Sequence, residues 1–144
     1  MAKTLKGLAG RMERLKKQIP KESGRLARET AIAVIVDLLA HTPVDTSLAL
    51  SNWQLHLNTP IMTAIQAYAK GKFGSTAHTS YNAALAEALR ELKSHKSGDT
   101  IWIINLIRYI VYLNQGHSSQ EPAQFVERAV DKGRMVISTL KMKL

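Results

Sequence analysis

The chain has 144 residues, of which 45% are apolar, and this is enough for one hydrophobic core in a single domain. Its formal net charge is +9, and the absence of cysteine excludes disulfides and thiolate chemistry. The longest apolar run, residues 31–40, is interrupted by Asp37. It is far shorter than the roughly 18 residues of a membrane span, so no membrane partner is expected.

The positive charge is concentrated near the N-terminus. Residues 1–30 hold nine basic and three acidic side chains, a net of +6, which leaves +3 for the other 114 residues. Such a segment can lie on nucleic acid, on an acidic protein surface, or simply in solvent. These interpretations stay open at this point.

Residues 1–19 are predicted to form a basic amphipathic helix or arm, ahead of a single α+β domain over residues 20–144. The apolar side chains of this helix recur three and four residues apart and form one narrow seam. The seam is the predicted interface with a second subunit or a partner, although it could instead pack inside the domain. Its residues are Leu5, Leu8, Met12, Leu15 and Ile19. The candidate contacts to DNA or to an acidic partner are Arg11, Arg14, Lys16 and Lys17.

Pro20 is predicted to end this helix and to begin a second one, because proline is tolerated in the first turn of a helix. The second helix is predicted to run to about Leu39. Its last part, residues 31–40, is apolar nearly all round and is the expected core helix.

A turn follows at residues 42–47, where Asp45 and Thr46 can bind backbone amides. The predicted structural turn residues are Pro43, Asp45, Thr46 and Ser47. Trp53, Leu55 and Leu57 then alternate with polar residues from Asn52 onward, which predicts a half-exposed strand.

Residues 59–79 show little periodicity and are predicted to form a loop. The loop is either a docking segment that becomes ordered only on assembly or an ordinary surface excursion. A helix is predicted from Tyr81 to about Lys93. Residues 101–106 are rich in β-branched and aromatic side chains, which predicts a central strand covered on both faces.

Residues 106–114 are predicted to form a short helix that ends before Gly116. Pro122 suits the first turn of a last helix, which Gly133 weakens by roughly 1 kcal/mol relative to alanine. Residues 141–144 are expected to fray. The predicted fold class is therefore α+β, with long N-terminal helices and a C-terminal helix packed on a small, mainly antiparallel sheet.

No catalytic, cofactor-binding or metal-binding residues are predicted. The five histidines are far apart in the sequence, so no two of them stand at ligand spacing. Residues 70–74 lack the residue order of a phosphate-binding loop, and no serine lies in a nucleophile-elbow context. We therefore expect a protein that is not an enzyme and uses no cofactor.

A small basic nucleic-acid-binding protein is an alternative that the charge supports. A helix-turn-helix is compatible with the pattern, but the aromatic residues fall mostly at core-like positions rather than between lysines and arginines. The charge therefore favours non-specific contact with phosphates over base recognition.

Three sequence blocks carry a resemblance to a known family. The first is Thr42-Pro43-Val44-Asp45-Thr46-Ser47 with a tryptophan, the second begins at Gly98-Asp99 and ends with a tyrosine, and the third runs from a glycine to a proline. In order and spacing they resemble the tail-completion or neck proteins of tailed bacteriophages, and they span about residues 42–130. The matching positions are Trp53, Asn105, Tyr109, Gly116, Gln120 and Pro122.

The chain departs from the family pattern at three positions. Ser47 and Gln124 stand where the family favours glycine, and Asn114 stands where it favours glutamate. Serine in place of glycine questions a left-handed turn at position 47. Asparagine at position 114 indicates that the charge of the glutamate is not needed.

The resemblance implies a structural protein of the virion with no catalytic group. Its subunits would form a ring, a hexamer or a dodecamer, at the head-tail junction after assembly in the host cytoplasm. One side of the ring would meet a head-closure or connector protein, and the other would meet a tail terminator or tail tube protein. DNA would pass through the lumen in non-specific proximity.

Overall fold

The computed structural model describes residues 4–144, so residues 1–3 of the predicted N-terminal arm lie outside the described part. Five helices and two strands make up the described fold. In chain order they are α1 (Leu5–His41), α2 (Leu48–Ser51), β1 (Gln54–Leu57), α3 (Ala77–Leu92), β2 (Ile101–Ile104), α4 (Ile110–Asn114) and α5 (Phe125–Thr139).

Helix α1 runs without a break through Pro20, which corrects the predicted helix end at that residue. Thr4 caps its start, where Oγ1 accepts a hydrogen bond from the backbone N–H of Gly7 at 3.0 Å. A proline inside a helix removes one backbone donor and crowds the carbonyl four residues earlier. Because Pro20 and Lys16 are both exposed, water can hydrate the carbonyl of Lys16 and the helix continues.

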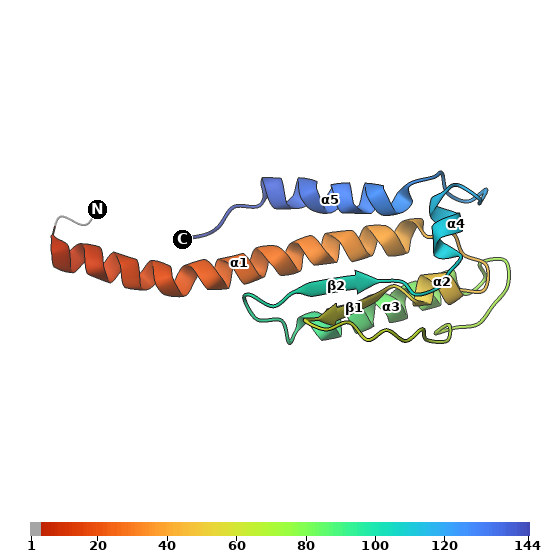
Figure 1. The fold of residues 1–144 in the computed structure, drawn as a ribbon, viewed down its shortest axis with the longest axis horizontal. Coiled ribbons are helices and arrows are strands. Elements are labelled where there is room, and N and C mark those ends of the chain that lie inside the picture. The colour runs from red at the N-terminus through yellow and green to blue at the C-terminus, as the bar shows by residue number, and fades with distance from the viewer. Residues whose placement is uncertain (1–3) are drawn as a thin grey trace.

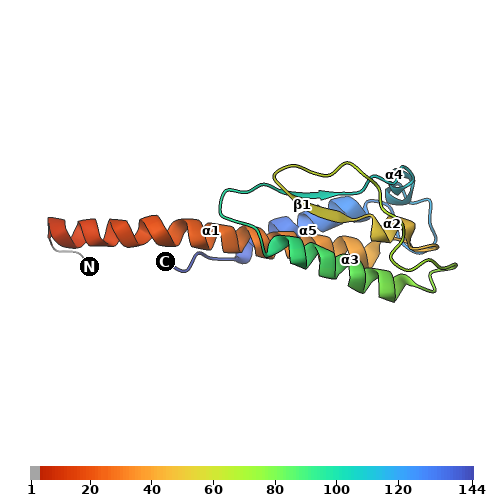
Figure 2. The same cartoon turned by 90° about the horizontal axis from the view of Figure 1, so that it is seen from below.

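The second half of α1 lies at the centre of the body, as Figure 1 shows. Helix α5 packs along it on one side and α3 on another, while β1 and α2 also pack against α3. The first half of α1 projects beyond all of these elements, as both views show (Figures 1 and 2). The α+β fold class is therefore confirmed, with the difference that the C-terminal helix packs on α1.

The sheet consists of β1 and β2 alone, paired antiparallel with Leu55 opposite Ile103. The prediction of a central strand covered on both faces is therefore wrong for β2. The side chain of Trp102 is 42% exposed, and its Nε1 donates a hydrogen bond to the carbonyl of Asn58 at 2.7 Å. Successive side chains of a strand point to opposite faces, so Trp102 lies on the face opposite Ile101 and Ile103, which pack against the core, and it reaches solvent.

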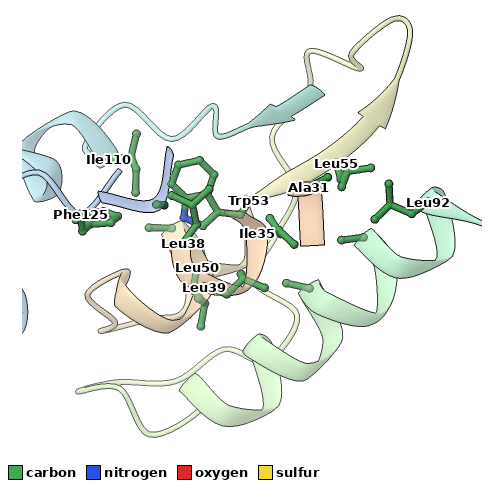
Figure 3. Close-up of a cluster of buried hydrophobic side chains, with 14 residues drawn as sticks. Ala31, Ile35, Leu38, Leu39, Leu50, Trp53, Leu55, Leu92, Ile110 and Phe125 are labelled. Atoms are coloured by element: carbon green, nitrogen blue, oxygen red, sulfur yellow. The ribbon is translucent and has the colours of Figure 1, made fainter. Parts of the chain in front are cut away.

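The core joins every helix and β1 (Figure 3). Phe125 and Ile35 have no exposed surface, and the side chain of Trp53 lies between these two in the view of Figure 3. The core residues are Ala31, Ile35, Leu38, Leu39, Ala49, Leu50, Trp53, Leu55, Ala84, Ala88, Leu92, Ile110, Phe125 and Ala129.

Three helix starts differ from the prediction. Helix α3 begins at Ala77, four residues before Tyr81, and α4 begins at Ile110 rather than at residue 106. Helix α5 begins at Phe125, so Pro122 lies outside its first turn. The physical reason at α5 is Gln124, whose left-handed backbone (φ 68°) prevents the helix from starting earlier.

Gly133 has a packing role that its helix propensity conceals. A Cβ atom at this position would lie 2.5 Å from Cγ2 of Val34 on α1. The glycine therefore lets α5 and α1 approach closely, and this contact offsets the cost of glycine inside a helix.

Candidate functional site

The first and third sequence blocks of the family resemblance meet the last part of the second block at the end of the body that lies opposite the projecting part of α1, which is called the motif end below. Gln120 of the third block binds the backbone of Val44 in the first block twice. Its Oε1 accepts from the N–H of Val44 at 2.8 Å, and its Nε2 donates to the carbonyl of Val44 at 2.9 Å. The side-chain amide thus forms two hydrogen bonds with one backbone residue, as a neighbouring β-strand would, and it links residues that are 76 positions apart.

The second block is joined to the first by Asn105. Its Nδ2 donates to the carbonyl of Ala49 at 2.9 Å, and its Oδ1 accepts from the N–H of Ile107 at 3.1 Å. The amide of Asn105 thus holds α2 and also shapes the chain after β2. The arrangement assigns Asn105 a positioning role.

Trp53 anchors the turn to the end of α1. Its Nε1 donates to Oγ1 of Thr42 at 2.8 Å, and this hydroxyl donates in turn to the carbonyl of Leu38 at 2.6 Å. Both Trp53 and Thr42 are buried, so each polar atom needs such a partner.

Asp45 uses its carboxylate to hold another part of the backbone. Its Oδ1 accepts from the N–H of Phe73 at 2.6 Å, and its carbonyl accepts from the N–H of Gly74 at 3.0 Å. Phe73 has a left-handed backbone (φ 56°) and a side chain that is 94% exposed. The left-handed backbone of a residue with a Cβ costs about 1–2 kcal/mol of conformational energy. The hydrogen bond from Phe73 to Asp45 therefore stabilises a strained backbone that holds the aromatic ring in solvent.

The remaining turn residues have local roles. Thr46 Oγ1 accepts only a long hydrogen bond of 3.4 Å from the N–H of Leu48. Pro43 lies at a hollow of about 410 Å³ at the surface, which is also lined by Leu48, Leu50 and Tyr109. Among these turn residues, Asp45 therefore makes the main side-chain hydrogen bond.

Ser47 has a left-handed backbone (φ 68°, ψ 6°), which removes the question that its replacement of glycine raised. The residue is only 2% exposed, and its Oγ lies 2.8 Å from Oγ1 of Thr76. Gln124, at the other glycine position of the family pattern, is also left-handed (φ 68°, ψ 32°). Both positions keep a backbone that glycine would adopt without strain.

Asn114 fills the place of the expected glutamate by binding the start of α5. Its Oδ1 accepts from the N–H of Val126 at 2.9 Å, and its backbone carbonyl accepts from the N–H of Gln124 at 2.6 Å. Its Nδ2 donates to both carboxylate oxygens of Glu127. A neutral amide thus supplies the acceptor that a helix N-terminus requires.

The other matched positions contribute differently. Tyr109 is 42% exposed and lines the hollow with Leu113. Gly116 has φ 91°, and a Cβ there would lie 3.1 Å from Cβ of Ala123. Pro122 is exposed and is not part of the lining of the hollow.

The loop before α3 is held by buried polar side chains. Asn52 Oδ1 accepts from the N–H of Ile65 at 2.8 Å, and its Nδ2 donates to the carbonyl of Ile65 at 2.9 Å. Ser51 Oγ accepts from the N–H of Tyr68 at 3.1 Å. Asn52 is fully buried, although the alternating pattern placed it on the exposed face. Only the tertiary contact with Ile65 shows why.

The loop still presents large apolar side chains to solvent. They are Ile61, Met62, Tyr68 and Phe73, with exposed fractions between 42% and 94%. Sequence reasoning missed Phe73 as a candidate site residue. Its signal was Phe73-Gly74 with two lysines close by, a tight turn that displays an aromatic ring.

The first half of α1, residues 5–21, is called the projecting helix below. Its seam is exposed on Leu5 (87%), Leu8 (46%), Met12 (61%) and Ile19 (43%), and Leu15 is half-buried. The alternative that the seam packs inside the domain is therefore wrong. Arg11, Arg14, Lys16 and Lys17 are exposed, and none of them forms an ion pair within residues 4–144.

The body reaches α1 first at Glu22, where the C-terminal tail returns. The carboxylate of Glu22 accepts from the backbone N–H of Lys143 at 2.9 Å and from the guanidinium of Arg25, and these bonds lower the pKa of Glu22 below its ordinary value. Arg25 Nη2 also donates to the carbonyl of Lys141 at 3.0 Å. The tail is therefore bound to α1, contrary to the expected fraying.

Within residues 4–144, the structure contains no group of three or more His, Asp or Glu side chains placed to hold a metal ion. No helix in the same range is long and apolar enough to cross a membrane. No family model, curated protein or solved structure matches the chain.

Proposed function

We propose that this chain is a structural protein of the neck of a tailed bacteriophage, without enzymatic activity. In this function its subunits form a ring, a hexamer or a dodecamer, at the head-tail junction. The ring lies between a head-closure or connector protein and a tail terminator or tail tube protein, and DNA passes through its lumen.

The observation that carries this proposal is the backbone at positions 47 and 124. The family pattern has glycine at both positions, and glycine is favoured where φ is positive. In this chain Ser47 and Gln124 each have φ 68°, although neither is a glycine. The left-handed geometry that the family glycines would serve is thus present at both places, which supports a shared local structure.

The hydrogen bonds between the blocks support the same proposal. Gln120 binds Val44, and Asn105 binds Ala49. The matched side chains therefore stabilise one another's segments, so their joint presence in the sequence has a structural reason. A chance match of three short patterns has no reason to produce such contacts.

The motif end offers two different surfaces, which suits a ring. The hollow lined by Leu48, Leu50 and Tyr109 lies toward α4, whereas Phe73 belongs to the loop that leads into α3. Figure 2 shows α4 on one side of α2 and the last part of this loop, where it runs into α3, on the other. A ring needs a heterologous interface, in which two different patches of the subunit meet.

A small basic nucleic-acid-binding protein is the second candidate function. The exposed, unpaired cations of the projecting helix favour it, because such cations can replace counterions on phosphates. This function predicts tight, salt-dependent DNA binding by a monomer or dimer, whereas a neck protein binds free DNA weakly and without sequence preference.

Native mass spectrometry combined with a salt-titrated DNA-binding assay separates the two functions. We expect rings of six or twelve subunits, alone or on addition of a head-closure protein, and weak DNA binding. Phe73→Ser should abolish the ring in a folded subunit, whereas Met135→Ser, which alters a 64% exposed side chain on α5, should leave it intact. A stable monomer with nanomolar DNA affinity at physiological salt would refute the neck function.

A further inference from the structure

The projecting helix carries an apolar seam that no part of the described chain covers. Figure 1 shows it extending beyond the body, and four of its five seam residues are at least 43% exposed. Exposed apolar residues arranged as one stripe mark an interaction surface rather than scattered surface hydrophobics. Their three-and-four spacing is the pattern that packs against another helix.

The same helix carries charge that has no internal partner. Residues 5–21 contain six basic side chains and one acidic side chain, a net of +5. None of these six cations forms an ion pair within residues 4–144. Arg11 directly precedes the seam residue Met12, and Lys16 directly follows Leu15, so the cations border the seam itself.

A second copy of this chain is a poor occupant for this surface. The residues that flank the seam as g and e positions are Ala9, Arg11, Lys16 and Gln18, and none is acidic. Two projecting helices packed in parallel would bring Arg11 of one next to Lys16 of the other. Like charges at these positions oppose pairing.

The body of a second copy is also a poor occupant. Most of its carboxylates already bind cations or amides of their own chain: Glu22 and Glu29 bind Arg25, Glu87 binds Arg90, Glu121 binds Arg128, Glu127 binds Asn114 and Asp131 binds Arg134. Free carboxylates for the projecting helix are therefore scarce on this surface.

DNA would pair with the cations of this surface but would not cover its apolar seam. Phosphates can pair with the cations, but they leave the seam exposed to water. A partner that covers the seam and also pairs with Arg11 and Lys16 needs an apolar stripe bordered by carboxylates.

We propose that the projecting helix binds an acidic amphipathic helix of a different protein. The partner's apolar stripe covers the seam from Leu5 to Ile19, and its flanking carboxylates pair with Arg11 and Lys16. This inference rests on the proposed function only in identifying the partner as a neighbouring neck protein. The chemistry of the partner follows from the projecting helix alone.

The test uses the full chain and a labelled synthetic peptide of about three heptads, with leucine at its seam positions and glutamate at its flanking positions. Two matched peptides replace the glutamates with lysine or the leucines with serine. Fluorescence anisotropy measures binding over a salt titration, and hydrogen exchange locates the contact. We expect the first peptide to bind at least about tenfold more tightly than either control, with protection of amides in residues 5–21.

Two variants of the chain sharpen this test. Leu8→Ser with Met12→Ser should weaken binding of the acidic peptide by about tenfold or more. Arg11→Glu with Lys16→Glu should reverse the preference toward the lysine peptide. The charge control is Lys93→Glu with Lys132→Glu, which alters two exposed cations of the body and should change nothing.

Three results would overturn the inference. One is equal affinity for the glutamate and lysine peptides. Another is a dimer in sedimentation velocity that the seam substitutions dissociate, which would make a second copy the occupant. The third is affinity for a short DNA duplex that falls as much in the seam variant as in the charge-reversal variant. Because none of these measurements requires a ring, failure here is distinguishable from failure of the proposed neck function.

Discussion

At the motif end of the molecule, side chains from one segment bind the backbone of another, as Gln120 does with Val44 and Asp45 does with Phe73. At the opposite end, the projecting helix has neither a packed seam nor a paired cation. The two ends belong to one chain and share α1, yet only at the motif end do the polar side chains find partners within the chain. The difference teaches that the body determines stability, whereas the projecting helix is available for binding.

The largest expected effect is the loss of Phe125 from the core. Phe125→Ala removes a side chain with no exposed surface, so it should lower the free energy of unfolding by about 3–5 kcal/mol. The matched change at the other end, Met12→Ala, should alter it by less than about 0.5 kcal/mol. Chemical denaturation measures both. A comparable loss for Met12→Ala would mean that the projecting helix packs on the body.

The next prediction applies one substitution to both halves of the comparison. Gly133→Ala places a Cβ 2.5 Å from Val34 and should destabilise the fold by about 1–3 kcal/mol. Gly10→Ala meets no atom within 4 Å and should instead favour the projecting helix by up to about 1 kcal/mol. Thermal unfolding measures the first effect and circular dichroism the second. Effects of the same sign would contradict this account of Gly133.

A smaller effect is expected at the link between the sequence blocks. Gln120→Glu removes the donor to the carbonyl of Val44 and places a carboxylate beside it, which should cost about 1 kcal/mol. Ser119→Glu adds the same charge at the neighbouring exposed position and should leave the free energy of unfolding within about 0.5 kcal/mol. Equal losses in the two variants would assign the effect to charge rather than to the lost hydrogen bond.

The smallest effect concerns pH and the C-terminal tail. The pKa of Glu22 is lowered by the Lys143 N–H and by Arg25, so this interaction stabilises the fold above the ordinary carboxyl pKa. It should be lost as pH falls below about 4, through the lowered pKa of the folded state. The chemical shift of the Lys143 amide should report this release, and Glu22→Gln should remove the titration. A shift that stays constant over this pH range would contradict the contact.

Local patterns predicted much of the fold because each depends on neighbouring residues. The three-and-four spacing predicted the helix that starts at Leu5, and the apolar run at residues 31–40 predicted the core part of α1. Pro20 misled the prediction, because a proline predicts a helix end only when the rest of the helix gains nothing by continuing. Here the following half of α1 packs on α3 and α5, and this packing holds the helix together.

The polar residues of the motif end were recognisable in sequence, but their partners were not. Nothing in a local pattern connects Asp45 with Phe73 or Asn52 with Ile65, because periodicity relates residues within one element and these partners lie in different segments. The buried state of Asn52 shows the limit clearly. Alternation placed it in solvent, whereas two hydrogen bonds to the backbone of Ile65 stabilise it inside.

The sequence by itself determined the α+β class, the charge asymmetry and the seam of the projecting helix, since each follows from composition or from spacing within one element. Only the tertiary structure decided that the seam is uncovered, that Ser47 and Gln124 are left-handed, and that Asp45 holds Phe73 toward solvent. Those facts depend on which distant segments meet. Contacts over many residues are set by the packing of the whole domain, and a local pattern carries no record of them.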